Sequence, residues 1–86
     1  MAKILRFELP ADGEWHVIEQ GHATPLHVGS RRSQFVEFWG YERDDLGPRE
    51  YKVLNTGDDV PDEAEYRGTT TDAGGYFVWH LITRRA

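Results

Sequence analysis

Apolar and polar residues alternate in short runs along this chain, and turn-forming residues separate one run from the next. No segment long enough for a helix repeats apolar residues at the i, i+3, i+4 and i+7 spacing of an amphipathic helix. Alternation with a period of two is typical of half-buried β-strands. We therefore expect an all-β fold, a small antiparallel β-sandwich or partly open barrel of about six to seven strands.

The runs define where these strands should lie. We expect strands over residues 3–9, 14–19, 26–29, 34–41, 49–54, 64–69 and 76–83, with a polar loop over 42–48 and frayed residues 84–86. Two runs, 34–41 and 76–83, are apolar on both faces. This predicts a central place in a sheet for 76–83, and for 34–41 either a central place or a strand that covers a second layer. In the run 64–69, simple alternation predicts that Ala64, Tyr66 and Gly68 face inward.

The length of 86 residues predicts one domain, residues 1–86, with a modest core and little room for a deep active site. There is no cysteine, so neither disulfides nor thiolate metal sites are available. The net charge of −5 disfavours nucleic acid as a partner, because such binding depends on basic side chains. No apolar run approaches the length of a membrane span or a signal peptide, so we expect no membrane association and a cytosolic protein.

Four histidines are the candidates for a transition-metal site: His16, His22, His27 and His80. Imidazole is a good ligand for such ions, but the spacing of these residues matches no known site. We therefore expect no metal and no other cofactor. His80 follows Trp79 in an apolar run, and we expect it to be buried and hydrogen-bonded.

No hydroxyl residue lies in a nucleophile-elbow pattern, and the chain shows no catalytic triad pattern, so we expect no enzyme. Five acidic residues between Asp58 and Glu65 fall in loop-like sequence. Their spacing is not that of a calcium-binding EF-hand, and a charge of −5 is small for a mimic of nucleic-acid phosphates. We interpret these carboxylates, and the basic pair Arg31-Arg32, as solvated loop residues.

Aromatic residues are numerous for so small a core. Tyr, Trp and Phe dominate the energetically important positions of protein interfaces. Two interpretations stay open: all the rings pack in the core, or some form a surface for a partner or a second copy. For the second case we select Trp15, Trp39 and Tyr41.

Several segments together resemble a family of small bacteriophage and prophage proteins of unknown function. The resemblance rests on Arg6-Phe7-Glu8-Leu9, on residues 21–28, on Asn55-Thr56-Gly57, on Pro61, on Tyr66-Arg67-Gly68-Thr69 and on Val78-Trp79-His80-Leu81. The chain departs from the family pattern at Asn55, where a glycine is usual, and in the acidic pair that follows the turn. The family positions are Gly57, Tyr66, Gly68, Trp79 and His80, and we expect structural roles for them. The resemblance implies a phage-encoded protein acting in the host cytoplasm, with a high-GC actinobacterium as host, and it carries over no catalytic residue.

These observations lead to one main expectation and two alternatives. We expect a non-enzymatic phage accessory protein that binds a host or phage protein through aromatic and acidic surface and forms a homo-oligomer, with a dimer favoured. The first alternative is a virion-associated structural module. The second is a small-ligand binder or minimal enzyme that uses His80 and nearby carboxylates.

Overall fold

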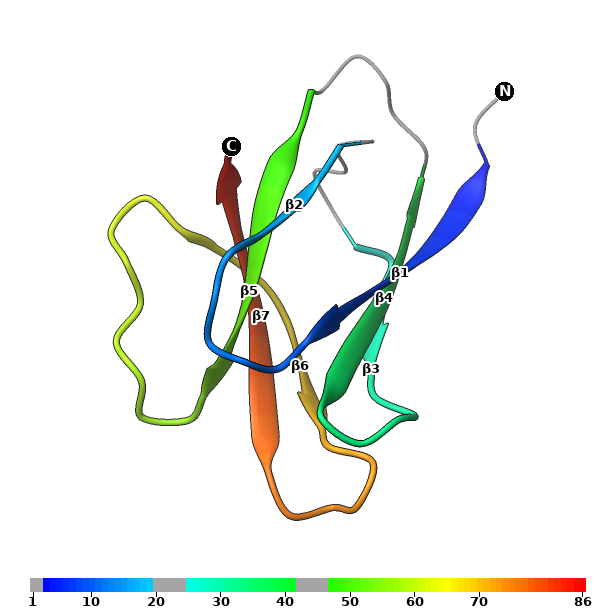
Figure 1. Ribbon diagram of the computed structural model, residues 1–86, viewed down its shortest axis with the longest axis vertical. Helices are drawn as coiled ribbons and strands as arrows, with labels where there is room; N and C mark the ends of the chain where they lie inside the picture. Colours follow the sequence, from blue (N-terminus) through cyan, green and yellow to red (C-terminus); the bar gives the residue numbers. More distant parts are fainter. Residues whose placement is uncertain (1–2, 20–24, 42–46) are drawn as a thin grey trace.

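The computed structural model of the chain describes residues 3–19, 25–41 and 47–86 (Figure 1). Its strands are β1 (Ile4–Pro10), β2 (His16–Ile18), β3 (His27–Gly29), β4 (Phe35–Tyr41), β5 (Arg49–Asn55), β6 (Glu65–Thr71) and β7 (Val78–Arg85). The described residues contain no helix. The expected all-β fold is confirmed: the seven strands form two antiparallel sheets, not closed into a barrel, in a small β-sandwich.

The two sheets have the strand orders β1-β4-β3 and β2-β5-β7-β6. The two runs that are apolar on both faces supply strands with neighbours on each side, β4 in the three-stranded sheet and β7 in the four-stranded one. Both central positions are therefore confirmed. The predicted loop 42–48 and the break between the predicted strands 14–19 and 26–29 fall largely outside the described residues.

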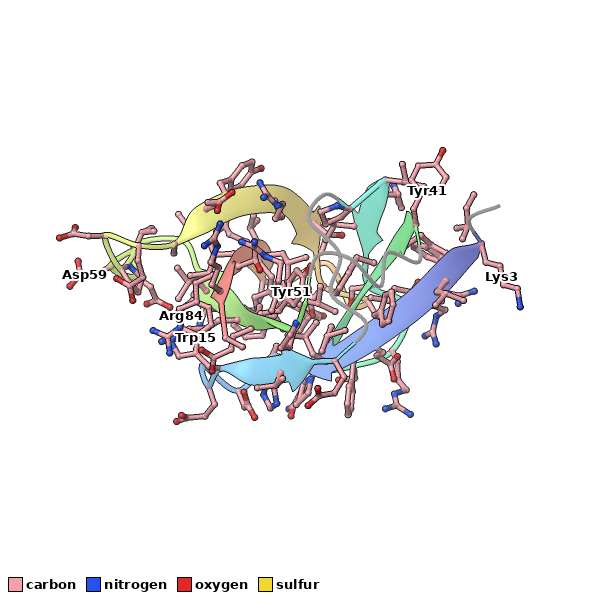
Figure 2. The ribbon with its side chains drawn as sticks, turned by 90° about the horizontal axis from the view of Figure 1, so that it is seen from above. Lys3, Trp15, Tyr41, Tyr51, Asp59 and Arg84 are labelled. Atoms are coloured by element: carbon pink, nitrogen blue, oxygen red, sulfur yellow. The ribbon has the colours of Figure 1, made fainter. Side chains whose placement is uncertain are left out.

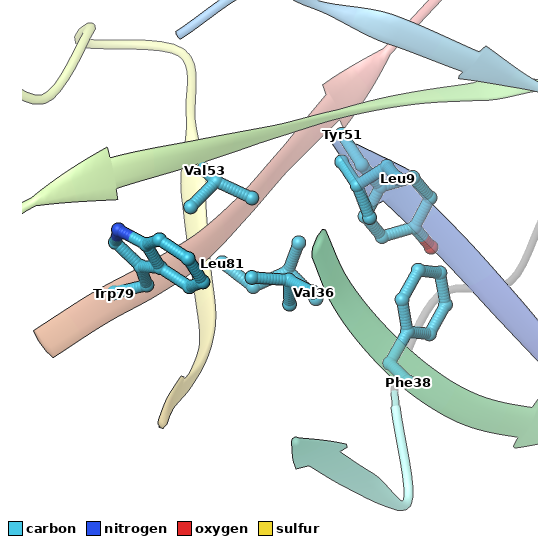
Figure 3. Close-up of a cluster of buried hydrophobic side chains, with 7 residues drawn as sticks. All are labelled: Leu9, Val36, Phe38, Tyr51, Val53, Trp79 and Leu81. Carbon is cyan, nitrogen blue, oxygen red and sulfur yellow. The ribbon is translucent and has the colours of Figure 1, made fainter. Parts of the chain in front are cut away.

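The core lies between the sheets and consists of side chains from the inner faces of β1, β4, β5 and β7 (Figure 3). Its buried members are Leu9, Val36, Phe38, Tyr51, Val53, Trp79 and Leu81. The Phe38 ring lies 4.7 Å from the ring of Tyr51 on the opposite sheet and 5.2 Å from that of Phe7. Trp79, one of the positions expected to have a structural role, is 6% exposed and lies in this core.

β3 passes close to β6 at Val28 and Gly68. A Cβ atom on Gly68 would lie 2.6 Å from Cγ2 of Val28, which is closer than real side chains allow. A glycine is therefore required at position 68, because the backbone of β6 lies directly against the side chain of Val28. β1 and β2 follow one another along the chain, one in each sheet, and lie along the lower rim of the molecule in Figure 2.

Three sequence predictions are wrong in detail. Tyr66 does not face inward but is 62% exposed, because a β-bulge between Tyr66 and Gly68 reverses the alternation along β6. Residues 84–86 are not all frayed: β7 continues to Arg85, and the guanidinium of Arg84 bonds to Glu50 and Glu63. The last strand begins at Val78 rather than at residue 76, so Tyr76 and Phe77 lie exposed in the hairpin turn before it.

We predict that Gly68→Ala lowers the free energy of unfolding by about 1–3 kcal/mol, because the added methyl overpacks the contact with Val28. Urea unfolding monitored by tryptophan fluorescence measures this. Gly29→Ala on β3 is the matched control, since its Cβ meets neighbouring atoms only at ordinary contact distance, 3.6 Å or more. Val28→Ala should restore part of the loss in the Gly68→Ala background, and a cost equal in both backgrounds would contradict the contact.

Candidate functional site

A pocket of about 260 Å³ opens on the outer face of the four-stranded sheet. It is lined by Leu54, Asn55, Thr56, Gly57, Asp58, Val60, Tyr66, His80 and Ile82. Leu54 and Ile82 are buried on a sheet face that points away from the core, because the loop after β5 and the side chain of Tyr66 flank them. The pocket therefore has an apolar floor with a few polar groups at its sides, which is the usual composition of a binding pocket.

Strand register explains why these side chains meet. Leu54 on β5, His80 on β7 and Thr69 on β6 are direct cross-strand partners and form one row across the sheet. Tyr66 pairs with Ile82 in the next row. Tyr66 and Thr69 are three residues apart and would normally face opposite sides of a strand, but the bulge at Arg67 places both on the outer face. The bulge interrupts the alternation along β6 and thereby places Tyr66 on the outer face, where it lines the pocket.

A chain of hydrogen bonds joins the polar groups of the pocket. His80 Nε2 lies 2.8 Å from Thr56 Oγ1, and His80 Nδ1 lies 2.9 Å from Thr69 Oγ1. Thr69 Oγ1 lies a further 2.6 Å from the hydroxyl of Tyr66. A neutral imidazole has one donor and one acceptor nitrogen, so one threonine accepts a hydrogen bond from His80 and the other donates one to it. The imidazole is held at both nitrogens, and the expected hydrogen bonding of His80 is confirmed, although the residue is only half-buried.

Both ring nitrogens of His80 already bond to hydroxyl groups of the same chain. A catalytic histidine normally has one nitrogen directed at the reacting group and the other oriented by a carboxylate. Here both nitrogens bond to threonine hydroxyls. The nearest lining carboxylate, Asp58, accepts a hydrogen bond from the backbone N–H of Asn55 at 2.8 Å. His80, Thr56 and Asp58 thus bond to other groups of the chain and hold the loop after β5 against the sheet.

The loop between β5 and β6, which lines part of the pocket, is acidic, and its Asp58 lies in the lining. Asp58, Asp59 and Asp62 are exposed in the loop between β5 and β6, and Asp59 projects at one end of the molecule (Figure 2). Glu63, at the end of the same loop, forms an ion pair with Arg84 at 2.9 Å. This bond lowers the pKa of Glu63, as does a backbone hydrogen bond that has the larger effect. The loop is thus tied to β7 at Glu63 and presents three further carboxylates to solvent beside an apolar pocket.

The five family positions divide between this pocket and the interior. Gly57, Tyr66 and His80 line the pocket, and Gly57 adopts a left-handed backbone (φ +99°) in the turn that begins the acidic loop. Gly68 and Trp79 face inward, at the β3–β6 contact and in the core. The expected structural roles of Gly68 and Trp79 are confirmed, whereas the other three border a cavity.

A family model matches the chain from residue 1 to residue 86. The chain belongs to the family described as Domain of unknown function (DUF7352). No curated protein and no solved structure gave a match. The family description names no activity, so the function of this DUF7352 domain has to be inferred from its geometry.

The three aromatic residues selected as interface candidates are not brought together in the DUF7352 domain. The ring of Trp15 is covered by the guanidinium of Arg84 at 3.9 Å, next to Lys52. Trp39 and Tyr41 share the outer face of the other sheet, where Trp39 is half-buried and Tyr41 is exposed. Their role in an interface stays a prediction.

The described histidines are also separate from one another. His16 bonds to Asp12 at 2.9 Å, and His27 lies against Trp39 with ring centroids 5.7 Å apart. His22 is outside the described residues. Within residues 3–19, 25–41 and 47–86, no three His, Asp or Glu side chains are placed to hold a metal ion. In the same ranges no helix has the length and apolar character needed to cross a bilayer.

Sequence reasoning missed a buried carboxylate, Glu37, on the outer face of β4. Its side chain is 2% exposed and is held by Arg31, from Nε at 2.6 Å and from a terminal nitrogen at 3.1 Å, and by Arg6 Nε at 2.6 Å. Glu37 lies directly opposite Glu8 on β1, a like-charge pair that would be unfavourable alone. Arg6 and Arg32 both bond to Glu8, so three arginines balance the two carboxylates.

The sequence contained a clue to this cluster, because a charged residue inside the central run 34–41 needs a partner. The pair Arg31-Arg32 is exposed, as expected for solvated loop residues, but both side chains also form ion pairs, Arg31 with Glu37 and Arg32 with Glu8. The bonds from Arg31, and then those from Arg6, lower the pKa of Glu37 although burial alone would raise it. The cluster therefore stabilises the fold in its ionised form.

We predict that Glu37→Gln lowers the free energy of unfolding at neutral pH by about 1–3 kcal/mol, because hydrogen bonds to a charged acceptor are lost. Since the folded pKa of Glu37 is lowered, its contribution is present above the ordinary glutamate range and is lost as the pH falls through the folded value. The difference between wild type and variant should thus shrink in acid. Urea unfolding at a series of pH values measures it, with the exposed Glu14→Gln as control. A difference independent of pH would contradict the role of ionised Glu37.

Proposed function

We propose that this DUF7352 domain is a non-enzymatic protein-binding module that holds an apolar side chain of its partner in the His80 pocket. The observation that carries the proposal is the combination of an apolar floor, Leu54 and Ile82, with polar groups that already bond to one another. An entering group gains by covering apolar surface and does not have to replace these hydrogen bonds. Such a pocket suits an aliphatic or aromatic side chain.

The acidic loop defines the chemistry around that side chain. Asp58, Asp59 and Asp62 lie on the loop that borders the pocket. Complementary charge speeds association and excludes partners of the same sign. We therefore propose that the bound segment carries lysine or arginine next to its apolar anchor. This interpretation gives the acidic loop of the sequence a role beside one aromatic side chain of the pocket, Tyr66.

The resemblance to phage proteins supports the biological part of the proposal. It favours a phage-encoded accessory protein that acts in the host cytoplasm on a host or phage protein. The acidic charge of the chain fits a protein partner better than nucleic acid.

We predict that short peptides with a central leucine or phenylalanine flanked by arginine bind the domain, and that the same peptides flanked by glutamate do not. Val60→Asp should weaken binding about tenfold or more, because it places a charge on the apolar wall. Val60 is 58% exposed, so this variant should fold. Isothermal titration calorimetry at low and high salt measures both effects, and binding should weaken with salt.

Val17→Asp is the matched control, since Val17 on β2 is similarly exposed, at 51%, but does not line the pocket. It should leave peptide affinity unchanged. Equal weakening by Val17→Asp and Val60→Asp, or binding that ignores the flanking charges, would contradict the proposal.

A small-ligand binder is the second candidate, favoured by the same preformed pocket. It differs in its expected response: a free metabolite would raise the melting temperature of the domain by itself, since binding to the folded state alone stabilises it. A thermal-shift screen of nucleotides, sugars and aliphatic amines distinguishes the two candidates. A hit lost in Val60→Asp and kept in Val17→Asp would favour this second candidate over the first.

A further inference from the structure

The two sheets have four edge strands, and three of them are protected against further pairing. β2 and β3 have three residues each. β6 is interrupted by its bulge and packs against β3 at Gly68. Short length, bulges and coverage by another element are the common ways in which proteins block sheet edges.

β1 has none of these three protections; it carries the charged residues Arg6 and Glu8 and ends at Pro10. It runs for seven residues, Ile4–Pro10, and pairs with β4 in one unbroken register over its whole length. No other described strand pairs with it, and its outer edge lies along the rim of the molecule (Figure 2). Among the described strands it is the one long, regular edge, with backbone groups available for another strand.

We propose that β1 pairs antiparallel with β1 of a second copy of this chain, on a two-fold axis at Phe7. Partners that oppose each other in a continuous sheet must point to the same face. Arg6 and Glu8 point outward and Phe7 points into the core, so the axis passes through a residue and not between two residues. The candidates for that residue are Arg6, Phe7 and Glu8.

Charge selects among the three registers. An axis at Arg6 places the two Arg6 side chains opposite each other, and an axis at Glu8 does the same for the two Glu8 side chains; both arrangements are unfavourable. An axis at Phe7 places Arg6 opposite Glu8 of the second copy, twice by symmetry. It also pairs Leu5 with Leu9 on the inner face and ends the ladder at Pro10, which has no N–H to donate. The β1 sequence is thus self-complementary in this one register.

The resulting dimer contains a continuous six-stranded sheet, in which β1 becomes central and each three-stranded sheet extends the other. The His80 pocket is on the four-stranded sheet of each copy and stays accessible. The dimer proposal is therefore independent of the proposed partner-binding function.

Sedimentation equilibrium of the wild-type chain from micromolar to millimolar concentration tests the proposal, together with amide hydrogen exchange at low and high concentration. We expect a monomer–dimer equilibrium in which protection of β1 amides rises with concentration, while that of the exposed β6–β7 turn does not. A wild-type chain that stays monomeric throughout, or dimerises without added protection in β1, would overturn it.

Charge reversal tests the register. Arg6→Glu and Glu8→Arg should each weaken self-association about tenfold, because each places like charges opposite one another in two symmetric pairs. Mixing the two variants should restore dimers, since the two glutamates on β1 of one variant then oppose the two arginines on β1 of the other. A general loss of stability would not be repaired by mixing. Circular dichroism checks that both fold, and Arg31 still holds Glu37 at two atoms in Arg6→Glu. Failure of the mixture to dimerise would exclude the Phe7 register.

Discussion

Phe38 on β4 lies against Tyr51 on β5, and this contact between rings across the two sheets is the interaction on which the rest of the structure depends. The chain has no cysteine, so packing between the sheets has to hold them together. Phe7 extends the contact to the edge strand β1, and Trp79 extends the core toward the opposite end. The close passage of β3 and β6 at Gly68 then sets how near the sheets can approach. A domain of this size has one core, and it occupies the inner faces of both sheets.

Because the inner faces form the core, binding has to use outer faces and edges. The four-stranded sheet provides a pocket on its outer face, where the bulge in β6 brings Tyr66 beside Thr69 and His80. The three-stranded sheet uses its outer face for the bonds between Glu37 and two arginines, and it leaves one long edge, β1. The two sheets thus differ in what they offer: one offers a cavity beside an acidic loop, and the other offers a strand that complements itself.

Much of the fold could be predicted from the sequence, because alternation reports directly on strands that are buried on one face. The central positions of β4 and β7 followed from apolar residues on both of their faces. The orientation of Tyr66 could not be predicted, since an extra residue in a strand leaves no compositional mark and reverses every face after it. The pocket was missed for the same reason, although His80 was selected. The bonds from Arg31 to Glu37 could not be predicted, because Glu37 is near Arg31 only when β3 and β4 are paired.

The most direct test of this account is to locate the binding surface by nuclear magnetic resonance, in a titration of the labelled domain with an arginine-flanked leucine peptide. We predict that amide shifts change at Leu54, Thr56, Val60, His80 and Ile82, around the pocket on the outer face of the four-stranded sheet. The residues of β4 in the other sheet should not respond. Shifts concentrated on Trp39 and Tyr41, or on the exposed turn at Tyr76 and Phe77, would contradict the claim that the His80 pocket is the site of recognition.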